Sequence, residues 1–292
     1  MSARWYPLSQ AVVCKASGKD ARRYLNNRLS NDLRSLAYPG SALAAALTAQ
    51  GKVQGLYTVF ATRDEAFLLA CDGGARQALF AALGKFIVAD RVSLEDVSNA
   101  WAFVHLIASE EEARSLAQLF GSESVYMRLS RRLGESGFDL LLPSPSIEET
   151  LRVVGDRLGT PMTSADYQLT RLRQGQPTFP DEINEGVVLT ECGTRDAVSF
   201  TKGCYVGQEV IERSDAIGKL PRTLERVVLS GTHTTLGAPI ANARGETIGK
   251  IASYAAVETS ATTYAFALLR TGVYSAGEQV VCEGLQGYIT KI

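Results

Sequence analysis

The spacing of apolar residues along the chain predicts helices and strands in alternation. In residues 17–33, Leu25 and Leu29 lie one helical turn apart, which predicts a helix. Residues 53–72 contain two apolar runs around a polar turn, which predict a β-hairpin. Residues 75–87 return to helical spacing, so the first part of the chain mixes both kinds of element.

The order of strand, helix and strand occurs twice within residues 53–142. Two strand-like runs, at 91–97 and 101–108, follow the predicted hairpin and helix. Ser109 and Glu112 then have the spacing of a capping box at the start of a helix, and two further apolar runs close the region. This order predicts an antiparallel sheet with helices on one face, of the ferredoxin-like type.

The second half of the chain changes from mixed to all-β character. Apolar residues at helical spacing predict a helix that Gly159 ends, and from about Thr223 short strands alternate with glycine-rich turns. The last part is therefore expected to be a small barrel or sandwich. The predicted class is α+β with three parts: a first α+β lobe of residues 1–52 and 143–222, an inserted ferredoxin-like lobe of residues 53–142, and a C-terminal β-barrel of residues 223–292.

Composition and charge narrow the class of protein. Apolar residues make up 46% and charged residues 21% of the 292 residues, which is typical of a globular chain rather than a disordered one. The net charge of −1 gives no strong field, so we expect neither direct nucleic-acid binding nor membrane binding. The sequence has no apolar run that could cross a bilayer and no secretory or transit signal, so a cytoplasmic location is expected.

Five scattered cysteines and two distant histidines limit the metal chemistry. No two cysteines form a CxxC pair, and their odd number favours free thiols in a reducing compartment. Zinc and iron–sulfur sites need clustered thiolate or imidazole ligands, so no metal site of the chain's own is expected.

The stretch FTKGCYVGQEVIERSDAIGK, residues 200–219, is the densest group of candidate functional residues. Lys202 lies two residues before Cys204, and a helix that begins just after the cysteine would stabilise a thiolate. Gly203 and Gly207 would let the backbone turn tightly and approach a ligand. Two interpretations remain open on the residues alone: a loop that presents a reactive thiol, and a tight turn whose cysteine fills a small apolar hole.

Other polar residues are weaker candidates. Gly73-Gly74 precedes a helix but lacks the rest of a phosphate-binding motif, which favours a plain turn. His105 lies within an apolar strand-like run and fits a core histidine. A solvated surface is the expected place of two polar groups, Arg131-Arg132 and the acids Asp181, Glu182 and Glu185.

The stretch KGCYVGQE, residues 202–209, resembles the signature of the YgfZ family, whose members are folate-binding relatives of the glycine-cleavage T-protein, an aminomethyltransferase. The resemblance extends over most of the chain. It includes Arg213, Gly218 and Arg222 after the signature, and elsewhere Gly18, Asp20, Ala21, Leu25, Leu29, Asn31-Asp32, Gly51-Lys52, Arg171, Gly175, Pro177, Gly245, Ile248-Gly249 and Ser253.

The resemblance implies a fold and a cofactor. The family fold is a cloverleaf of two α+β lobes, one of them ferredoxin-like, and a C-terminal β-barrel around a central pocket for tetrahydrofolate or a derivative. The resemblance places the signature loop at this pocket. Cys204 would then be a redox or nucleophilic group, and Lys202 would tune the thiol or hold the folate tail. The residues expected to bind the folate are Gly203, Tyr205, Gly207, Gln208, Glu209, Arg213, Asn31 and Asp32, and Arg222 would join Arg213 in pairing with folate carboxylates or stabilising the loop.

Two departures separate this chain from the aminomethyltransferases it resembles. Gln54 and Gly55 occupy the places of an Asp-Asp pair, of which one acid contacts the folate and helps to drive methylene transfer. Arg173 occupies the place of a glutamate that binds the pterin, and a guanidinium cannot accept a hydrogen bond from the pterin amino group. Aminomethyl transfer is therefore not the expected activity.

The family resemblance implies an accessory protein rather than a classical enzyme. YgfZ-like proteins are implicated in the assembly or repair of iron–sulfur enzymes, and an effect on tRNA modification would be indirect, through such client enzymes. The expected partners are thus a folate-type molecule and iron–sulfur client enzymes. One alternative is a folate-dependent one-carbon transferase of the aminomethyltransferase type. Another is a non-catalytic scaffold that has lost folate binding.

Overall fold

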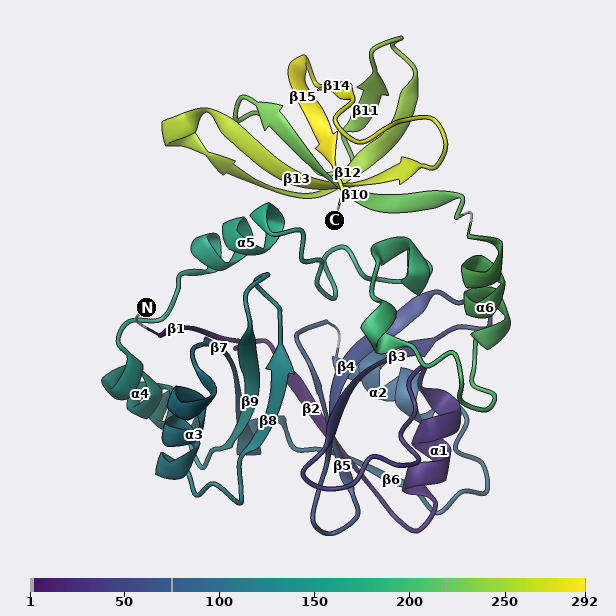
Figure 1. The fold of residues 1–292 in the computed structure, drawn as a ribbon. Coiled ribbons are helices and arrows are strands. Elements are labelled where there is room, and N and C mark those ends of the chain that lie inside the picture. Colours follow the sequence, from purple (N-terminus) through teal and green to yellow (C-terminus); the bar gives the residue numbers. More distant parts are fainter. Residues whose placement is uncertain (1–2, 75, 219, 292) are drawn as a thin grey trace.

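The computed structural model describes residues 3–74, 76–218 and 220–291. Figure 1 shows three bodies, two units of sheet and helix side by side and a β-barrel above them. The mixed α/β body and the closed C-terminal barrel confirm the fold class predicted from the sequence.

The first unit is a five-stranded antiparallel sheet with two helices. Its strand order is β3-β4-β5-β2-β6. The two helices α1 and α2 cover one face, where Leu25, Leu29 and Leu83 share a core with residues of the sheet. The elements are β2 (Val12–Ser17), α1 (Ala21–Arg28), β3 (Ser41–Leu47), β4 (Val53–Ala61), β5 (Phe67–Cys71), α2 (Arg76–Gly84) and β6 (Ser93–Asp96).

The second unit is a four-stranded antiparallel sheet of order β1-β7-β9-β8. Its helices α3 and α4 cover the outer face, where Leu116 and Val154 pack on Val104 and Leu140. Ser109 begins α3 with the predicted capping box. The elements are β1 (Arg4–Pro7), the 3-10 turn η1 (Ser98–Ala100), β7 (Trp101–Ile107), α3 (Glu110–Leu119), β8 (Tyr126–Ser130), β9 (Gly137–Pro143) and α4 (Ile147–Leu158).

The two sheets pack face to face. Phe60 and Leu68 of the first sheet share one core with Phe103 and Leu141 of the second. The layers are therefore helices, sheet, sheet and helices. A sheet that is covered on both faces has no solvated side, and β5 is accordingly buried at all five of its positions.

The lobe boundaries expected from the sequence differ from this arrangement. β4, β5 and β6 pair with β2 and β3 rather than with the strands of residues 101–143, so residues 53–142 are not one lobe. The five-stranded unit, residues 12–96, instead lies in the chain between β1 and β7 of the other unit. Hydrophobic spacing gives the order of strands but not their partners. For that reason the sequence predicted that α2 and α3 belong to one ferredoxin-like unit. In the structure, α2 packs on the five-stranded sheet and α3 on the four-stranded sheet.

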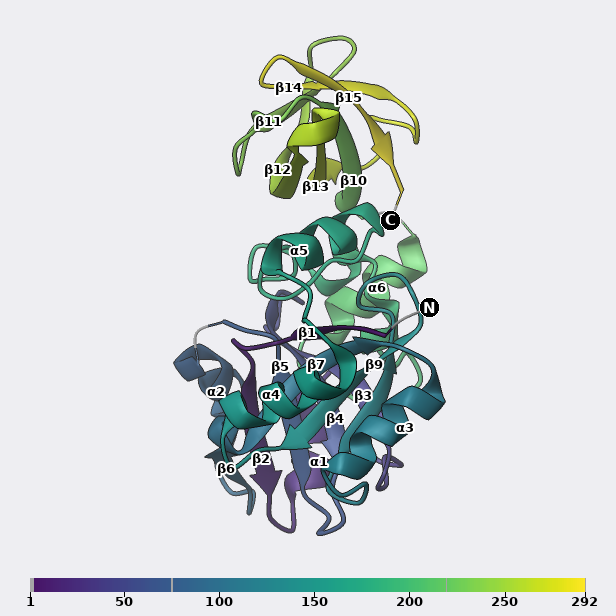
Figure 2. The ribbon, with the colours of Figure 1, turned by 90° about the vertical axis from the view of Figure 1, so that its left-hand side faces the viewer.

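The remaining chain connects the two units to the barrel. α5 lies directly beneath the barrel, as Figures 1 and 2 both show. The connecting elements are α5 (Ser164–Arg173), the 3-10 turns η2 (Leu189–Cys192) and η3 (Arg195–Ala197), and α6 (Gln208–Ile217). The barrel closes in the order β10-β13-β12-β11-β14-β15 around apolar side chains. Its elements are β10 (Arg222–Ser230), β11 (Pro239–Asn242), β12 (Thr247–Val257), the 3-10 turn η4 (Glu258–Ser260), β13 (Thr262–Arg270), β14 (Gln279–Cys282) and β15 (Leu285–Thr290).

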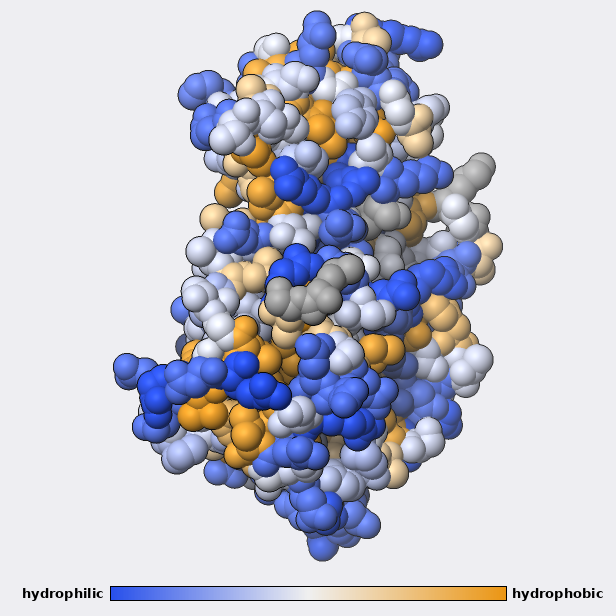
Figure 3. Space-filling model, turned by 60° about the vertical axis from the view of Figure 1, so that its left-hand side comes forward, coloured by the Kyte–Doolittle hydropathy of each residue, from blue (hydrophilic) through white to orange (hydrophobic). Residues whose placement is uncertain are grey.

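Hydrophobic residues reach the surface in separated groups. On the face drawn in Figure 3, they alternate with hydrophilic residues both on the barrel and on the body below it. Within residues 3–74, 76–218 and 220–291, no helix combines the length and the apolar character that are needed to cross a membrane.

Candidate functional site

A cavity of about 480 Å³ lies where the two sheets meet the connecting segment. Its walls come from β3 and β4, the end of β5, β8 and β9, and two stretches of the connecting segment, residues 175–178 and 192–196. Apolar side chains including Leu43, Leu56 and Pro177 line part of it. The cavity therefore combines elements that are far apart in the sequence, and its volume is within the usual range of small-molecule sites.

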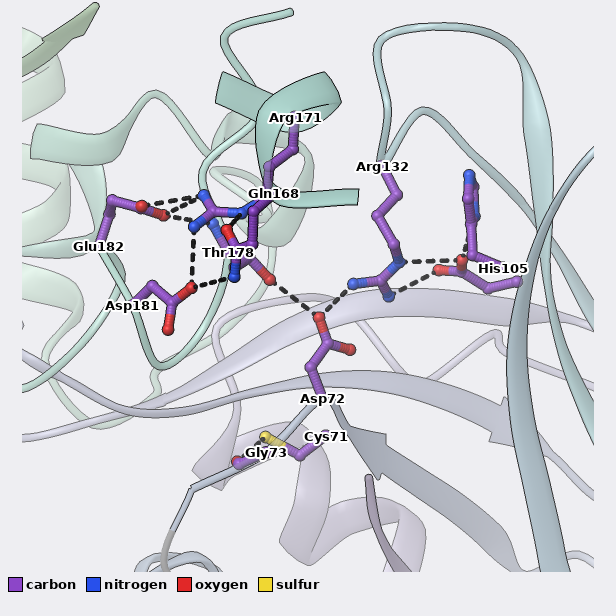
Figure 4. A network of polar contacts seen from close by, with 11 residues as sticks. Cys71, Asp72, Gly73, His105, Arg132, Gln168, Arg171, Thr178, Asp181 and Glu182 are labelled. Carbon is purple, nitrogen blue, oxygen red and sulfur yellow. Dashed lines mark hydrogen bonds and ion pairs between the residues drawn. The ribbon is translucent and has the colours of Figure 1, made fainter. Parts of the chain in front are cut away.

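A buried polar network forms one wall of this cavity (Figure 4). On the second sheet, Nδ1 of His105 lies 2.8 Å from Oδ1 of Asp139. The guanidinium of Arg132 donates to both oxygens of Asp139, at 3.1 and 3.0 Å, and also to Oδ2 of Asp72 at the end of β5. Arg132 thus joins the two sheets at the wall of the cavity.

The network continues from the first sheet to the barrel. The hydroxyl of Thr178 donates to Oδ2 of Asp72 at 3.0 Å, and its backbone N–H donates to Glu182 at 3.0 Å. Both Glu182 oxygens accept from Arg171 of α5, at 2.9 and 2.8 Å, and one also accepts from Ser253 of the barrel. The polar groups near the cavity therefore tie all three bodies of the molecule together.

Burial and ion pairing set the ionisation of this network. Burial alone would raise the pKa of the Asp139 carboxyl, but the Arg132 guanidinium and His105 outweigh it and the pKa is lowered. Burial opposes the charge of Arg132 as well, and its two carboxylate neighbours raise its pKa well above the usual value. For Glu182 burial dominates over Arg171 and raises the pKa.

Lys202 of the signature is buried, with 5% of its surface exposed, and caps the end of α1. Its ammonium donates to the carbonyl oxygens of Leu29 and Asn31, each at 2.7 Å, and to that of Asn26. An ammonium has three N–H donors, and all three are used here. Burial lowers the pKa of Lys202 to about 8, against the attraction of the nearby Asp32 carboxylate. This position ties the loop to α1 and differs from the expected role of tuning the Cys204 thiol or holding the folate tail.

Steric crowding explains why a glycine occupies the position before α6 in the signature. Gly207 has φ of 87°, and a Cβ there would lie 2.6 Å from the carbonyl oxygen of Thr48 in the turn between β3 and β4. Tyr205 is buried beside Lys202, whose Nζ lies 5.1 Å from the ring centroid. Gln208 accepts from the Tyr205 backbone N–H and donates to Glu212. These contacts hold the loop in place, and Gly203 beside them is exposed.

The early Asn-Asp pair is used for backbone contacts. Asn31 donates to the carbonyl oxygens of Leu43, at 2.8 Å, and Asp196, at 2.9 Å. Asp32 accepts from the backbone and side chain of Arg34, whose hydrogen bonds lower the pKa of Asp32 to about 2. Asn31 thus positions the segment that borders the cavity, without lining the cavity itself.

Two of the charged residues expected at the folate are exposed, and a third is paired. Glu209 and Arg213 are exposed on α6, and the described part of the chain offers neither side chain a hydrogen bond or ion pair. Arg222 pairs with the buried Glu191, with nitrogen–oxygen distances of 3.0 and 2.9 Å. Among the residues described, none of 202–209, Arg213 or Arg222 lines the 480 Å³ cavity.

Cys204 differs from the other four cysteines because it is exposed. The interpretation of Cys204 as the filling of an apolar hole is therefore wrong. Burial raises the pKa of the thiols of Cys14 and Cys71 to about 12, and it also raises the pKa of the Cys192 thiol. Of the five thiols, only that of Cys204 is thus presented to solvent.

The three residues that depart from the aminomethyltransferase pattern make contacts within the protein. The amide oxygen of Gln54 accepts from the buried Arg28 at 2.9 Å, and Gly55 is pressed against Tyr57, whose hydroxyl would lie 2.5 Å from a Cβ. Arg173 is exposed, with its guanidinium 4.7 Å from the ring centroid of Tyr264 in the barrel. These three positions supply no carboxylate to the cavity.

Sequence reasoning missed several polar residues of the site. Arg132 and Glu182 were expected on a solvated surface, which is wrong: the Glu182 side chain is fully buried and that of Arg132 is 12% exposed. A signal was present for two others, because His105 and Asp139 both interrupt apolar strands, and they are direct partners in the register of β7 and β9. The expectation of a core histidine at His105 is confirmed.

No group of three or more His, Cys, Asp or Glu side chains suited to a metal ion occurs among the described residues. Near the network, two buried side-chain atoms have no hydrogen-bond partner among the described residues: Nε2 of His105 and the hydroxyl oxygen of Tyr167.

Comparison with known proteins identifies the fold of this chain. No model of a protein family matches the chain. Its fold matches the crystal structure of the glycine cleavage system aminomethyltransferase T from Bartonella henselae with a TM-score of 0.83 over 100% of this chain and 86% of that one. The sequence identity is 17%, so this match shows the fold alone. The fold is that of an aminomethyltransferase.

Two relatives by sequence define the family. The human mitochondrial iron–sulfur cluster assembly factor IBA57 is 30% identical over 272 residues, which cover 85% of this chain and 74% of the relative. The tRNA-modifying protein YgfZ of Colwellia psychrerythraea is 24% identical, over 74% of this chain and 69% of the relative. The chain belongs to the family of YgfZ and IBA57.

Proposed function

We propose that the protein is a folate-binding accessory factor that supports the assembly or repair of iron–sulfur enzymes and affects tRNA modification indirectly. Two relatives support this, one named as an iron–sulfur cluster assembly factor and one as a tRNA-modifying protein. In this proposal the cluster belongs to the client enzyme. The five free cysteines favour a reducing compartment such as the cytoplasm.

The single observation that carries the proposal is the cavity between the sheets. Its 480 Å³ suits a pterin ring with part of the attached tail. Leu43, Leu56 and Pro177 offer apolar contact to the faces of a flat ring. Arg128 and Arg131 line the same cavity and offer cations to the carboxylates of a glutamate tail. Tetrahydrofolate, when bound, would supply one-carbon or redox chemistry, and the chain's own residues would bind and orient it.

The exposed thiol of Cys204 has a separate place in the proposal. It lies on the signature loop, outside the set of residues that line the cavity. A thiol in that position faces solvent and can meet a client enzyme without displacing the folate. The proposal therefore assigns folate binding to the cavity and client contact to the loop.

The experiment is an anaerobic calorimetric titration of the protein with tetrahydrofolate, beside Cys204→Ala. Saturable binding that is equal in both proteins is expected, because the thiol does not line the cavity. In a host strain that lacks its own copy, Cys204→Ala is expected to restore client iron–sulfur activity less than the wild-type chain. No saturable binding by the wild-type chain would overturn the folate assignment, and full restoration by Cys204→Ala would overturn the role of the thiol.

A one-carbon transferase is the second candidate, because one observation favours it. The cavity contains a carboxylate, Asp72, although the acids of the aminomethyltransferase pattern are absent at Gln54 and Gly55. A turnover assay with tetrahydrofolate and an aminomethyl donor separates the two functions. Folate-dependent turnover by the wild-type chain would favour the transferase over the accessory factor.

A further inference from the structure

One carboxylate oxygen at the cavity has no hydrogen-bond partner among the residues that the structure describes. Asp72 directly follows β5, and its Oδ2 accepts both from Arg132 and from the hydroxyl of Thr178. Within the described part of the chain, Oδ1 of the same carboxylate accepts no hydrogen bond, as Figure 4 also shows. Because Asp72 lines the cavity, Oδ1 is an acceptor available to a ligand.

The surroundings of Asp72 hold the carboxylate in one orientation. Arg132 is itself fixed from the other side by two hydrogen bonds to the buried Asp139. Arg132 therefore cannot rotate freely to cover Oδ1. One guanidinium is shared by two carboxylates, and its contact with Asp72 is made to Oδ2. A group that donates hydrogen bonds is favoured at Oδ1.

The rest of the wall suits a flat ring with polar edges. Thr58 of β4 and Ser130 of β8 line the cavity, and for neither hydroxyl do the described residues supply a hydrogen-bond partner. Apolar Leu43 and Leu56 lie in the same wall and cover the faces of a ring. A wall that offers a carboxylate oxygen as well as hydroxyls complements an edge that carries an amino group next to a ring N–H.

We infer that Asp72 anchors the pterin ring by accepting hydrogen bonds from its 2-amino group and adjacent ring N–H at Oδ1. This rests on the proposed folate ligand and deepens it. Asp72 takes over the task of the acids that are missing at Gln54, Gly55 and Arg173, but from a different strand. It is a binding residue and takes part in no bond-making step.

Asp72→Asn is a sharp test because of its local chemistry. Arg132 is only a donor, so the amide oxygen of the new side chain turns toward Arg132 and the amide nitrogen occupies the place of Oδ1. A donor then faces the donors of the pterin. The dissociation constant for tetrahydrofolate is expected to rise by about 10- to 100-fold, since a charged hydrogen-bond acceptor has been replaced by an unsuitable group.

The matched control is Asp64→Asn. Asp64 is an exposed carboxylate in the hairpin between β4 and β5 of the same sheet, where it pairs with Lys15. Its variant is expected to bind tetrahydrofolate as the wild-type chain does. Thermal unfolding of all three proteins shows whether each is folded at the titration temperature.

A ligand series keeps the test valid even if Asp72→Asn does not fold. The wild-type chain is titrated with tetrahydrofolate and with an analogue in which hydrogen replaces the 2-amino group. The analogue is expected to bind about tenfold or more weakly. In Asp72→Asn the difference between the two ligands is expected to collapse, because the group that reads the 2-amino group is gone.

Guanine carries the same amino and ring N–H edge, so guanosine is the third ligand. Weaker binding of guanosine than of tetrahydrofolate supports a pterin, and equal or tighter binding that competes with tetrahydrofolate overturns the ligand class. If Asp72→Asn and the analogue both bind as tightly as their parents, Asp72 is not the anchor, while the proposed folate function stands. If the wild-type chain binds no tetrahydrofolate, both fall together.

Discussion

Lys202 and Gln208 of the signature loop use their polar groups in the opposite way to Asp72 at the cavity wall. In the loop, the three N–H donors of Lys202 are spent on backbone carbonyls, and the Gln208 amide is spent on neighbours within the loop and α6. At the cavity, Asp72 uses Oδ2 for contacts with the protein, whereas its Oδ1 accepts from none of the described residues. A polar group whose hydrogen bonds are all made within the protein supports the fold. A polar group that can still accept or donate a hydrogen bond is available to a ligand.

This difference separates what is visible in the sequence from what is available for binding. The loop is conspicuous because its residues are adjacent, but adjacency reflects the tight geometry that Gly207 and Lys202 impose. The cavity residues come from seven separate segments and make no motif. Substitutions in the polar network and in the loop are therefore expected to lower the free energy of unfolding. Substitutions of residues that line the cavity are expected to lower the affinity for the ligand.

The largest effect is expected for Asp139→Asn. The buried carboxylate holds Arg132 and His105, and removing its charge leaves the guanidinium with Asp72 alone. The free energy of unfolding at pH 7 is expected to fall by about 3–5 kcal/mol, measured with denaturant. Asp156→Asn, which removes an exposed carboxylate paired with Arg152, is the matched control and is expected to cost less than about 1 kcal/mol.

The same variant has a pH dependence of known sign. The pKa of Asp139 is lowered in the folded protein, so its contribution is fully present above the unfolded value of about 4. It is lost as the pH falls below that value toward the folded pKa. The stability difference between wild type and Asp139→Asn is therefore expected to shrink below about pH 4. A difference that stays constant down to pH 3 would contradict the role of the charge.

Lys202→Met is expected to have the next largest effect. It keeps the apolar stem but leaves three carbonyl oxygens at the end of α1 without their donor, which costs roughly 3 kcal/mol of unfolding free energy. Lys19→Met, an exposed lysine before the same helix, serves as the control. The affinity for tetrahydrofolate below the melting range is expected to be unchanged. A tenfold loss of affinity in a folded Lys202→Met would place the loop in the ligand site.

Arg131→Ala sharpens the comparison within the cavity. Arg131 is exposed at the cavity and is not paired within the described residues, so it is free to meet a tail carboxylate. The variant is expected to weaken tetrahydrofolate binding by about three- to fivefold, in line with a solvent-exposed ion pair. Binding of a tetrahydropterin without the glutamate tail is expected to be unchanged. Equal weakening of both ligands would show that Arg131 acts on the ring instead.

Cys204→Ser is expected to change stability least. The side chain is exposed, so the free energy of unfolding is expected to stay within about 0.5 kcal/mol of wild type. A thiol reagent added to the native protein is expected to label one cysteine rapidly in wild type and none in the variant, because the other four are buried. Rapid labelling of two or more thiols in the wild-type protein would contradict the burial of those four.

Local features of the fold could be predicted from the sequence, and pairings could not. The capping box at Ser109 and the glycine-punctuated barrel strands depend on residues close in sequence, and both are observed. The partners of β4 and β5 depend on which sheet offers an edge, and spacing does not record that choice. The expected lobe boundary at residue 53 was placed in the middle of a sheet for this reason.

The candidate site shows the same division. The loop around Cys204 was found from its motif, although its place relative to the cavity was not. Asp72 was passed over because it was read as the last residue of the predicted hairpin, residues 53–72, and its partner Arg132 lies 60 residues away. A single polar residue at the end of the fully buried β5 was the available signal. Its meaning depends on Arg132, which only the folded structure brings beside it.

Because β1 pairs with β7, the first strand cannot complete its pairing until about a hundred further residues have been synthesised. Residues 4–7 leave the ribosome before the whole five-stranded unit, and their partners at 104–107 follow about a hundred residues later. At ordinary rates of translation this is a wait of roughly 5–20 s. Trp5, which is 3% exposed in the finished fold, has no sheet to enter during that interval. A cut or a bulky fusion near residue 4 would therefore act on a distant sheet, by leaving the edge of β7 open to other chains.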